Sequence, residues 1–137
     1  ASAAAAGLAL ERLLWVRCAG NPEHALKAAD LLVQGGGFGL VALDLGDIPA
    51  RIARRIPLSG WYRFQRALEN TPTALVVLEQ EPWAKSCAAL ILETQQEGVA
   101  WSGAPGCSRL LRGVRLGVTP RKPVRSAHAA FEAKALG

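Results

Sequence analysis

Three polar side chains follow apolar runs at positions where a nucleotide-handling protein would need them. Asp44 closes the run 38–45, and Glu79 and Gln80 close the run 73–78. An acid at the end of a buried strand can hold Mg²⁺, and a strand-terminal Glu or Gln can orient a water molecule for hydrolysis. Both roles serve a bound phosphate, so they require a phosphate-binding loop elsewhere in the chain.

The chain has no such loop. The motif GxxxxGKS/T places glycine-rich backbone and a lysine between a strand and a helix start, where free amides and the helix dipole meet the anion. The glycine cluster Gly35-Gly36-Gly37-Phe38-Gly39 instead follows a predicted helix and precedes a predicted strand, which is typical of a helix stop and a tight turn. We therefore interpret Asp44, Glu79 and Gln80 as degenerate nucleotide-site remnants, and we expect no catalytic residue and no cofactor.

Histidine and cysteine offer little chemistry. His24 lies in the first turn of a predicted helix and His128 lies near the C-terminus, and neither has a Cys or Ser at a spacing that would pair with it. Cys18, Cys87 and Cys107 are scattered and form no CxxC pair, which disfavours a zinc or redox motif and fits a reducing cytosol. We expect no metal site and a cytoplasmic location.

The basic residues are unevenly distributed. Residues 1–97 hold 9 Lys/Arg and 10 Asp/Glu, whereas residues 98–137 hold 7 Lys/Arg and 1 Asp/Glu. Arg51, Arg54 and Arg55 form a first basic set, which has the i, i+3, i+4 spacing of a helix face. A second basic set lies near the C-terminus and also includes Arg109 and Arg125. The residues that we expect to bind a partner are Arg51, Arg54, Arg55, Arg112, Arg115, Arg121 and Lys122.

This charge asymmetry favours an acidic partner, either nucleic acid or protein. Single-strand binding favours aromatic side chains among the charges, and none stands between Trp101 and Phe131. A protein partner is therefore favoured over nucleic acid, while weak phosphate attraction to DNA and a plain solvated face stay open. Trp61, Tyr62 and Trp83 lie near predicted element ends, where an exposed aromatic would anchor an interface.

The apolar pattern predicts alternating strands and helices. Strands are predicted over 13–16, 38–45, 73–78, 87–92 and 110–119, and helices over 21–34, 48–56 and 59–70, with a short helix around 127–135. Asn21 should cap its helix, with Pro22 at the first helical position. Ser59 should cap the helix over 59–70, in which Trp61, Phe64 and Leu68 should face inward. The continuous run 38–45 predicts a sheet buried on both faces. Gly98 is expected in a turn.

These elements predict an α/β fold in a single domain. The first three strands should be parallel because helices connect them, and the last two should extend the same sheet as an antiparallel hairpin. We expect a flexible Ala-rich tail over 1–10, the α/β domain over 11–120 and a basic tail over 121–137. The N-terminus lacks the basic region of a signal peptide and no apolar run reaches membrane-spanning length, so no membrane contact is expected. The absence of Met favours a fragment or a processed product.

Several of these segments resemble the second half of a RecA-type core. Residues 13–16, 21–26 (NPEHAL) and 39–44 (GLVALD) are similar to a strand, a helix start and the apolar strand that ends in the magnesium-side Asp. Residues 74–80 (ALVVLEQ) resemble the next strand, whose terminal Gln senses the nucleotide. The resemblance covers residues 10–123, lacks the phosphate-loop half, and leaves residues 81–86 where the second DNA-binding loop would be.

Among RecA-like remnants, the chain is most similar to the ImuA family, SOS-induced accessory proteins of the bacterial translesion mutasome. This resemblance implies a non-catalytic RecA-like adaptor that binds RecA, the polymerase-like scaffold ImuB, or both. Two alternatives stay open, namely a SulA-like cell-division inhibitor that binds FtsZ and a weak single-stranded DNA-binding module.

Overall fold

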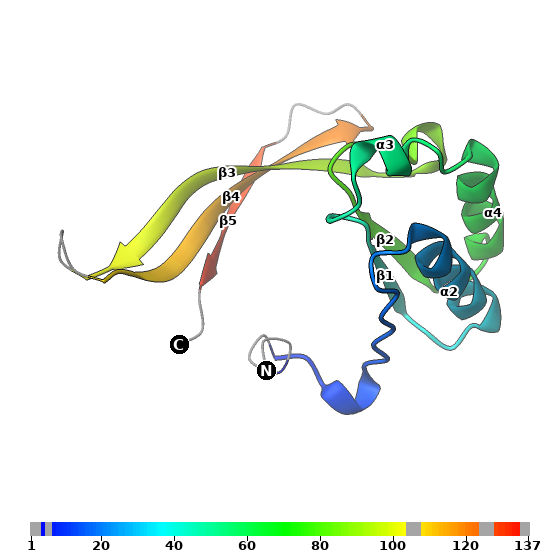
Figure 1. Ribbon diagram of the computed structural model, residues 1–137, viewed down its shortest axis with the longest axis horizontal. Helices are drawn as coiled ribbons and strands as arrows, with labels where there is room; N and C mark the ends of the chain where they lie inside the picture. Colours follow the sequence, from blue (N-terminus) through cyan, green and yellow to red (C-terminus); the bar gives the residue numbers. More distant parts are fainter. Residues whose placement is uncertain (1–3, 5–6, 104–107, 124–127, 135–137) are drawn as a thin grey trace. The chain divides into compact units, whose positions relative to one another are not determined.

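The computed structural model describes residues 4, 7–103, 108–123 and 128–134. The chain divides into two compact units, one of which is Trp15–Ala88, while the other combines Ala1–Leu14 with Ala89–Gly137. The first unit contains α2 (Pro22–Gly35), β1 (Leu40–Asp44), α3 (Ala50–Ala53), α4 (Leu58–Leu68), β2 (Ala74–Leu78) and the 3₁₀ turn η2 (Lys85–Cys87) (Figure 1). The second contains the 3₁₀ turn η1 (Leu10–Arg12) and the strands β3 (Ile91–Ser102), β4 (Leu110–Lys122) and β5 (Ala129–Lys134).

Helix α2 begins where the sequence predicts because its first turn is capped. The Asn21 side chain accepts hydrogen bonds from the backbone N–H groups of Glu23 at 3.0 Å and His24 at 3.1 Å. Pro22 fits the first helical position, where a backbone N–H has no partner within the helix. Gly36 ends the helix with a φ of 69°, a conformation that glycine adopts without strain. The predicted helix over 21–34 is confirmed.

Strands β1 and β2 form a two-stranded parallel sheet. Leu40 pairs with Ala74 and Asp44 with Leu78, and the Leu45 N–H donates to the Leu78 carbonyl at 2.8 Å beyond the last pair. The parallel arrangement of these two strands is confirmed. The strand predicted over 13–16 is wrong, because these residues have no strand partner in the described part of the chain and Trp15 is 74% exposed.

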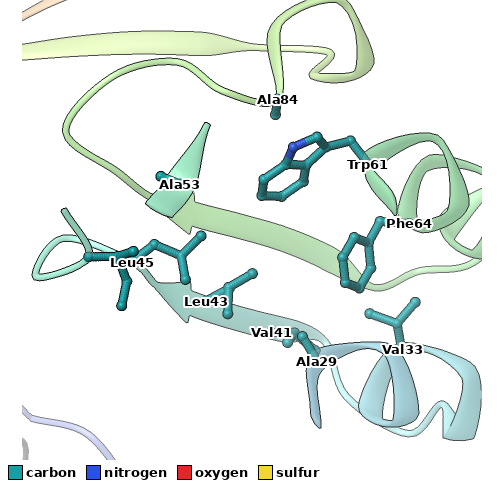
Figure 2. Close-up of a cluster of buried hydrophobic side chains, with 10 residues drawn as sticks. Ala29, Val33, Val41, Leu43, Leu45, Ala53, Trp61, Phe64 and Ala84 are labelled. Carbon is teal, nitrogen blue, oxygen red and sulfur yellow. The ribbon is translucent and has the colours of Figure 1, made fainter. Parts of the chain in front are cut away.

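The core of the first unit lies between this sheet and the helices. Figure 2 shows the side chains that build it, which are Val41, Leu43 and Leu45 from β1 and its end, Ala29 and Val33 from α2, Ala53 from α3, Trp61 and Phe64 from α4, and Ala84. Burial alternates along β1, and Leu40 and Leu78 on the other face are 59% and 52% exposed. The predicted burial of both faces is therefore wrong, because the three helices pack against one face.

Two predicted helices are shorter than expected. The helix predicted over 48–56 is regular only over α3, after which the N–H groups of Arg55 and Ile56 bond three residues back and tighten the chain into a 3₁₀ turn. Helix α4 begins at Leu58 and follows Pro57, which supplies no side-chain cap, so the predicted capping role of Ser59 is wrong. The inward positions predicted for Trp61 and Phe64 are confirmed.

The second unit contains an antiparallel sheet in which β4 lies between β3 and β5 (Figure 1). The predicted hairpin between the last two strands is confirmed as β3–β4, but β3 begins at Ile91 and residues 85–87 form η2. Gly98, predicted in a turn, lies inside β3 next to a register shift. The expected extension of the β1–β2 sheet is wrong, because β3, β4 and β5 form a sheet of their own.

Strand β5 replaces the helix predicted around 127–135. Residues 129–134 pair with β4 from Val118↔Ala129 to Gly113↔Lys134, while residues 127 and 135 lie outside the described residues. The Ala-rich composition favours a helix, but an isolated helix this short is not stable in water. Pairing with β4 satisfies the same backbone groups, so the tertiary contact overrides the local propensity.

Candidate functional site

The parallel pairing brings the three predicted nucleotide-site remnants to one edge of the β1–β2 sheet. Asp44 closes β1 opposite Leu78, and Glu79 and Gln80 follow directly. The Asp44 Oδ1 atom accepts a hydrogen bond from the Gly46 N–H at 2.9 Å, and Gln80 Nε2 donates to the Gly46 carbonyl at 2.7 Å. Both side chains therefore hold the turn that follows β1.

Glu79 is only partly accessible to solvent. Its Oε2 atom is buried and has no hydrogen-bond partner among the described residues. Burial raises the pKa of the Glu79 carboxyl, and hydrogen bonds from the backbone of Ala84 and Trp83 oppose this effect without cancelling it. The carboxyl thus binds a proton more readily than an exposed Glu does. Its backbone bonds also fasten the end of β2 to the segment around Trp83.

This edge of the sheet holds one acid in a turn, Asp44, and one half-buried acid, Glu79. Within the described ranges, no group of three or more His, Cys, Asp or Glu side chains is arranged to hold a metal ion. Cys18 and Cys87 are half-buried free thiols, and Cys107 lies outside the described residues. No helix in the described part of the chain is long and apolar enough to span a bilayer.

The first basic set lies on and just after α3. Arg51 belongs to the helix, and Arg54 and Arg55 follow in the 3₁₀ turn, with all three side chains exposed. In a 3₁₀ turn residues three apart lie one above the other, which places Arg51 and Arg54 on the same side. The regular helix ends at Ala53, so Arg51, Arg54 and Arg55 do not share one helix face.

Arg54 is held by two contacts with the segment after β2. Its guanidinium carbon lies 5.4 Å from the centroid of the Trp83 ring, which is a cation–π contact. Its Nη2 atom lies 3.9 Å from Glu81 Oε2. Both partners of this ion pair are more than half exposed, so the pair contributes little to stability.

An open groove of about 570 Å³ adjoins Arg54. Its lining comes from α3 and its end, from the start of α4 and from the segment after β2. The lining residues are Ala53, Arg54, Ile56, Pro57, Leu58, Glu81 and Trp83. We name this feature the Arg54 groove. It combines apolar side chains, an aromatic ring and the Arg54–Glu81 ion pair.

The sequence singled out Arg54 and Trp83 separately but not the groove between them. Arg54 and Trp83 are separated in the chain by α4 and β2, and nothing in the sequence near either residue indicates that the two come into contact. The one available signal was a tryptophan in the short Glu81-Pro82-Trp83 connection, where an aromatic must either cover the core edge or form a surface. Tyr62 is 43% exposed and shares a 3.3 Å hydrogen bond with Ser86, whereas Trp61 is buried in the core.

The second basic set is divided between the faces of the β3–β4–β5 sheet and lies among acids. Arg121 forms an ion pair with Glu93, and a hydrogen bond from Arg121 holds the pKa of that carboxyl below its usual range. Arg115 pairs in register with Glu132 of β5. Arg112 is exposed at a register shift between β3 and β4.

Lys122 is half-buried at the end of β4, in register with Ile91. At Gly117, His128 Nε2 lies 2.9 Å from Glu97 Oε1. Arg109 precedes β4, and Arg125 lies outside the described residues. Within the described sheet, the basic side chains of β4 therefore do not form one uniform positive surface.

One face of this sheet carries a group of apolar side chains. Alternation along the paired strands places Val114, Leu116 and Val118 of β4 on the same face as Val99 of β3 and Phe131 of β5. Val99 and Phe131 are 37% and 49% exposed. The sequence analysis missed this face, because the prediction of a helix around 127–135 removed β5 from the sheet.

No protein-family model matches this chain, and no curated protein matches it.

Proposed function

We propose that this chain is a non-catalytic RecA-like adaptor in SOS-induced translesion DNA synthesis, which binds RecA, the polymerase-like scaffold ImuB, or both. The observation that carries the proposal is the Arg54 groove, where an exposed arginine lies against a tryptophan beside apolar side chains. Arginine and tryptophan are enriched among the residues that dominate protein interfaces. Arg51 and Arg55 add positive charge in the same turn.

The strand ends give further support. In a RecA-type core the positions that Asp44 and Gln80 resemble serve magnesium and nucleotide sensing. In this chain both side chains are bonded to Gly46, which fits a structural role in the turn. The parallel pairing of β1 and β2 is also compatible with a remnant of such a core.

The ion pairs of the second unit weaken the case for a DNA-binding module. Arg121 and Arg115 lie beside Glu93 and Glu132, and these acids would repel a phosphate backbone. A protein surface, in which positive and negative groups alternate, is compatible with the same arrangement.

Direct binding measurements test the proposal. The full chain is immobilised and exposed in turn to RecA filaments assembled on single-stranded DNA with a slowly hydrolysed ATP analogue, to purified ImuB, to FtsZ and to a single-stranded oligonucleotide. We expect saturable binding to RecA filaments or ImuB with a Kd of about 1 μM or tighter, which corresponds to about −8 kcal/mol. Binding to neither protein at tens of micromolar refutes the adaptor role. Binding to FtsZ alone, or to the oligonucleotide alone with a steep salt dependence, assigns one of the alternatives instead.

Charge-reversal variants distinguish a specific contact at the first basic set from general electrostatic attraction between the chain and its partner. The Arg51→Glu/Arg54→Glu double variant should lose partner binding, whereas Arg66→Glu should retain it, because Arg66 lies on α4 and does not line the groove. Equal binding by the two variants would remove the first basic set from the interface.

A further inference from the structure

We infer that the Arg54 groove takes an acidic peptide segment of a partner protein, with one apolar side chain inserted into the groove and neighbouring carboxylates at the arginines. The inference rests on the proposed adaptor function, because it specifies the part of the partner that this surface contacts. It adds the chemical class of the bound segment and the residues that select it.

The groove suits a single apolar side chain. Ala53, Ile56, Pro57 and Leu58 contribute aliphatic surface, and Trp83 contributes an aromatic ring. The groove has a volume of about 570 Å³ and is open to solvent. A leucine- or phenylalanine-sized anchor would remove these apolar groups from water, which is the main source of binding free energy at such a surface.

The charge around the groove selects the residues that flank the anchor. Arg54 is the one arginine and Glu81 the one carboxylate among the groove-lining residues, and Arg51 and Arg55 are exposed close to Arg54 in the chain. The Arg54–Glu81 separation of 3.9 Å at an exposed site makes a weak pair, so a carboxylate of the partner can take the place of Glu81. Trp83 meanwhile holds the Arg54 guanidinium at the groove.

The same features disfavour a nucleic acid in this groove. Single strands bind where successive bases stack on several aromatic side chains along a positive channel. The groove lining offers one aromatic ring, Trp83, and places the Glu81 carboxylate beside it. An acidic peptide needs one anchor site and a few positive partners, which matches the groove.

A defined peptide provides the test. The probe is a fluorescein-labelled ten-residue peptide with two aspartates on each side of a central leucine and glycine or serine elsewhere. Its binding to the full chain is followed by fluorescence anisotropy, and amide chemical shifts locate the contact. We expect a Kd of tens to hundreds of micromolar, loss of binding when the central leucine becomes alanine or the aspartates become lysines, and amide shifts at residues 53–56, 58, 81 and 83.

Variants of the chain separate the groove from the rest of the surface. Arg54→Ala should weaken binding at least fivefold, and Arg66→Ala should leave the Kd unchanged. Trp83→Phe should retain part of the affinity, which guards against loss of folding in a Trp83→Ala variant. Equal affinity of Arg54→Ala and Arg66→Ala, equal binding of the lysine peptide, or no binding of the aspartate peptide at millimolar concentration would overturn the inference.

The outcomes distinguish this inference from the adaptor function. If the aspartate peptide binds at the groove but RecA filaments and ImuB do not bind the chain, the adaptor function fails and the groove specificity stands. If RecA filaments or ImuB bind and Arg54→Ala leaves that affinity unchanged, the groove specificity fails and the adaptor function stands.

Discussion

Replacement of Phe64 by alanine tests whether the helices form a real core over the parallel strands. The Phe64 side chain is 5% exposed, and its ring centroid lies 6.2 Å from that of Trp61. Removing a buried phenylalanine ring costs about 3–5 kcal/mol, because the transfer free energy of the ring is lost and the remaining cavity closes only in part. The unit Trp15–Ala88 has 74 residues, for which a total stability of about 4–11 kcal/mol is ordinary. Phe64→Ala should therefore leave this unit close to its unfolding threshold.

Urea denaturation of the full chain, followed by helical circular dichroism and by tryptophan fluorescence, measures this effect. All α-helices of the described chain lie in the unit that contains Phe64, so the helical signal reports on it. Phe64→Leu should cost much less, because it keeps most of the apolar volume. Phe131→Ala makes the same chemical change at a side chain that is 49% exposed in β5, and it should leave the helical transition unchanged. A Phe64→Ala cost below about 1 kcal/mol would contradict the packing of α4 against the β1–β2 sheet.

Three smaller predictions follow from single contacts. Asn21→Ala removes the acceptor for two backbone N–H groups of α2 and should lower the unfolding free energy by about 1 kcal/mol in urea, whereas Asn21→Asp should not. Glu79→Gln should raise the melting temperature at pH 7 but not at pH 3.5, since a raised pKa means that ionisation removes stability as the pH rises above about 4. Gly113→Ala would bring a Cβ atom to 2.9 Å from the Ala133 carbonyl oxygen, and it should reduce amide-exchange protection in β5 without changing protection in α2.

For each of these three predictions, a specific result would contradict the reasoning. Equal stability of the Asn21→Ala and Asn21→Asp variants would show that the cap contributes nothing. A Glu79→Gln effect of the same size at both pH values would mean that packing rather than charge burial sets it. Unchanged amide-exchange protection of β5 in the Gly113→Ala variant would show that the pairing of β4 with β5 tolerates a side chain at position 113.

The parts of the fold that follow from neighbouring residues could be predicted from the sequence. Asn21 and Pro22 fix the start of α2 through contacts within four residues, and Gly36 ends it through its own backbone freedom. The inward direction of Trp61 and Phe64 follows from helical periodicity alone. None of these features requires knowledge of the rest of the chain.

The failures concern residues whose structure depends on a distant partner. The apolar residues 13–16 could be a buried strand only beside another strand, and no strand pairs with them in the described structure. Residues 129–134 have helix-favouring composition, yet they pair with β4. An apolar pattern indicates that a segment tends to be buried, but it does not indicate which strand the segment pairs with.

The site was predictable to the same limited extent. The parallel order of the two strands correctly placed Asp44 near Glu79 and Gln80. The hydrogen bonds to Gly46 could not be predicted, because they depend on the path of the turn after β1. The Arg54 groove needs the end of α3 and the segment after β2 to meet, which only the tertiary structure shows.

The tertiary structure also changes the meaning of the charge asymmetry. A division at residue 97 assigns Glu93 and Glu97 to the neutral part of the chain, although β3 places them beside the basic strand β4. The excess positive charge of residues 98–137 is thus partly neutralised inside the sheet, and an Arg121→Glu substitution would bring like charges together and disturb the sheet itself. By contrast, Arg54 has only the long, exposed pair with Glu81, and no acid lies within ion-pair distance of Arg51 or Arg55 among the described residues. The arginines of α3 and its following turn, rather than those of β4, are therefore the stronger candidates for contact with an acidic partner.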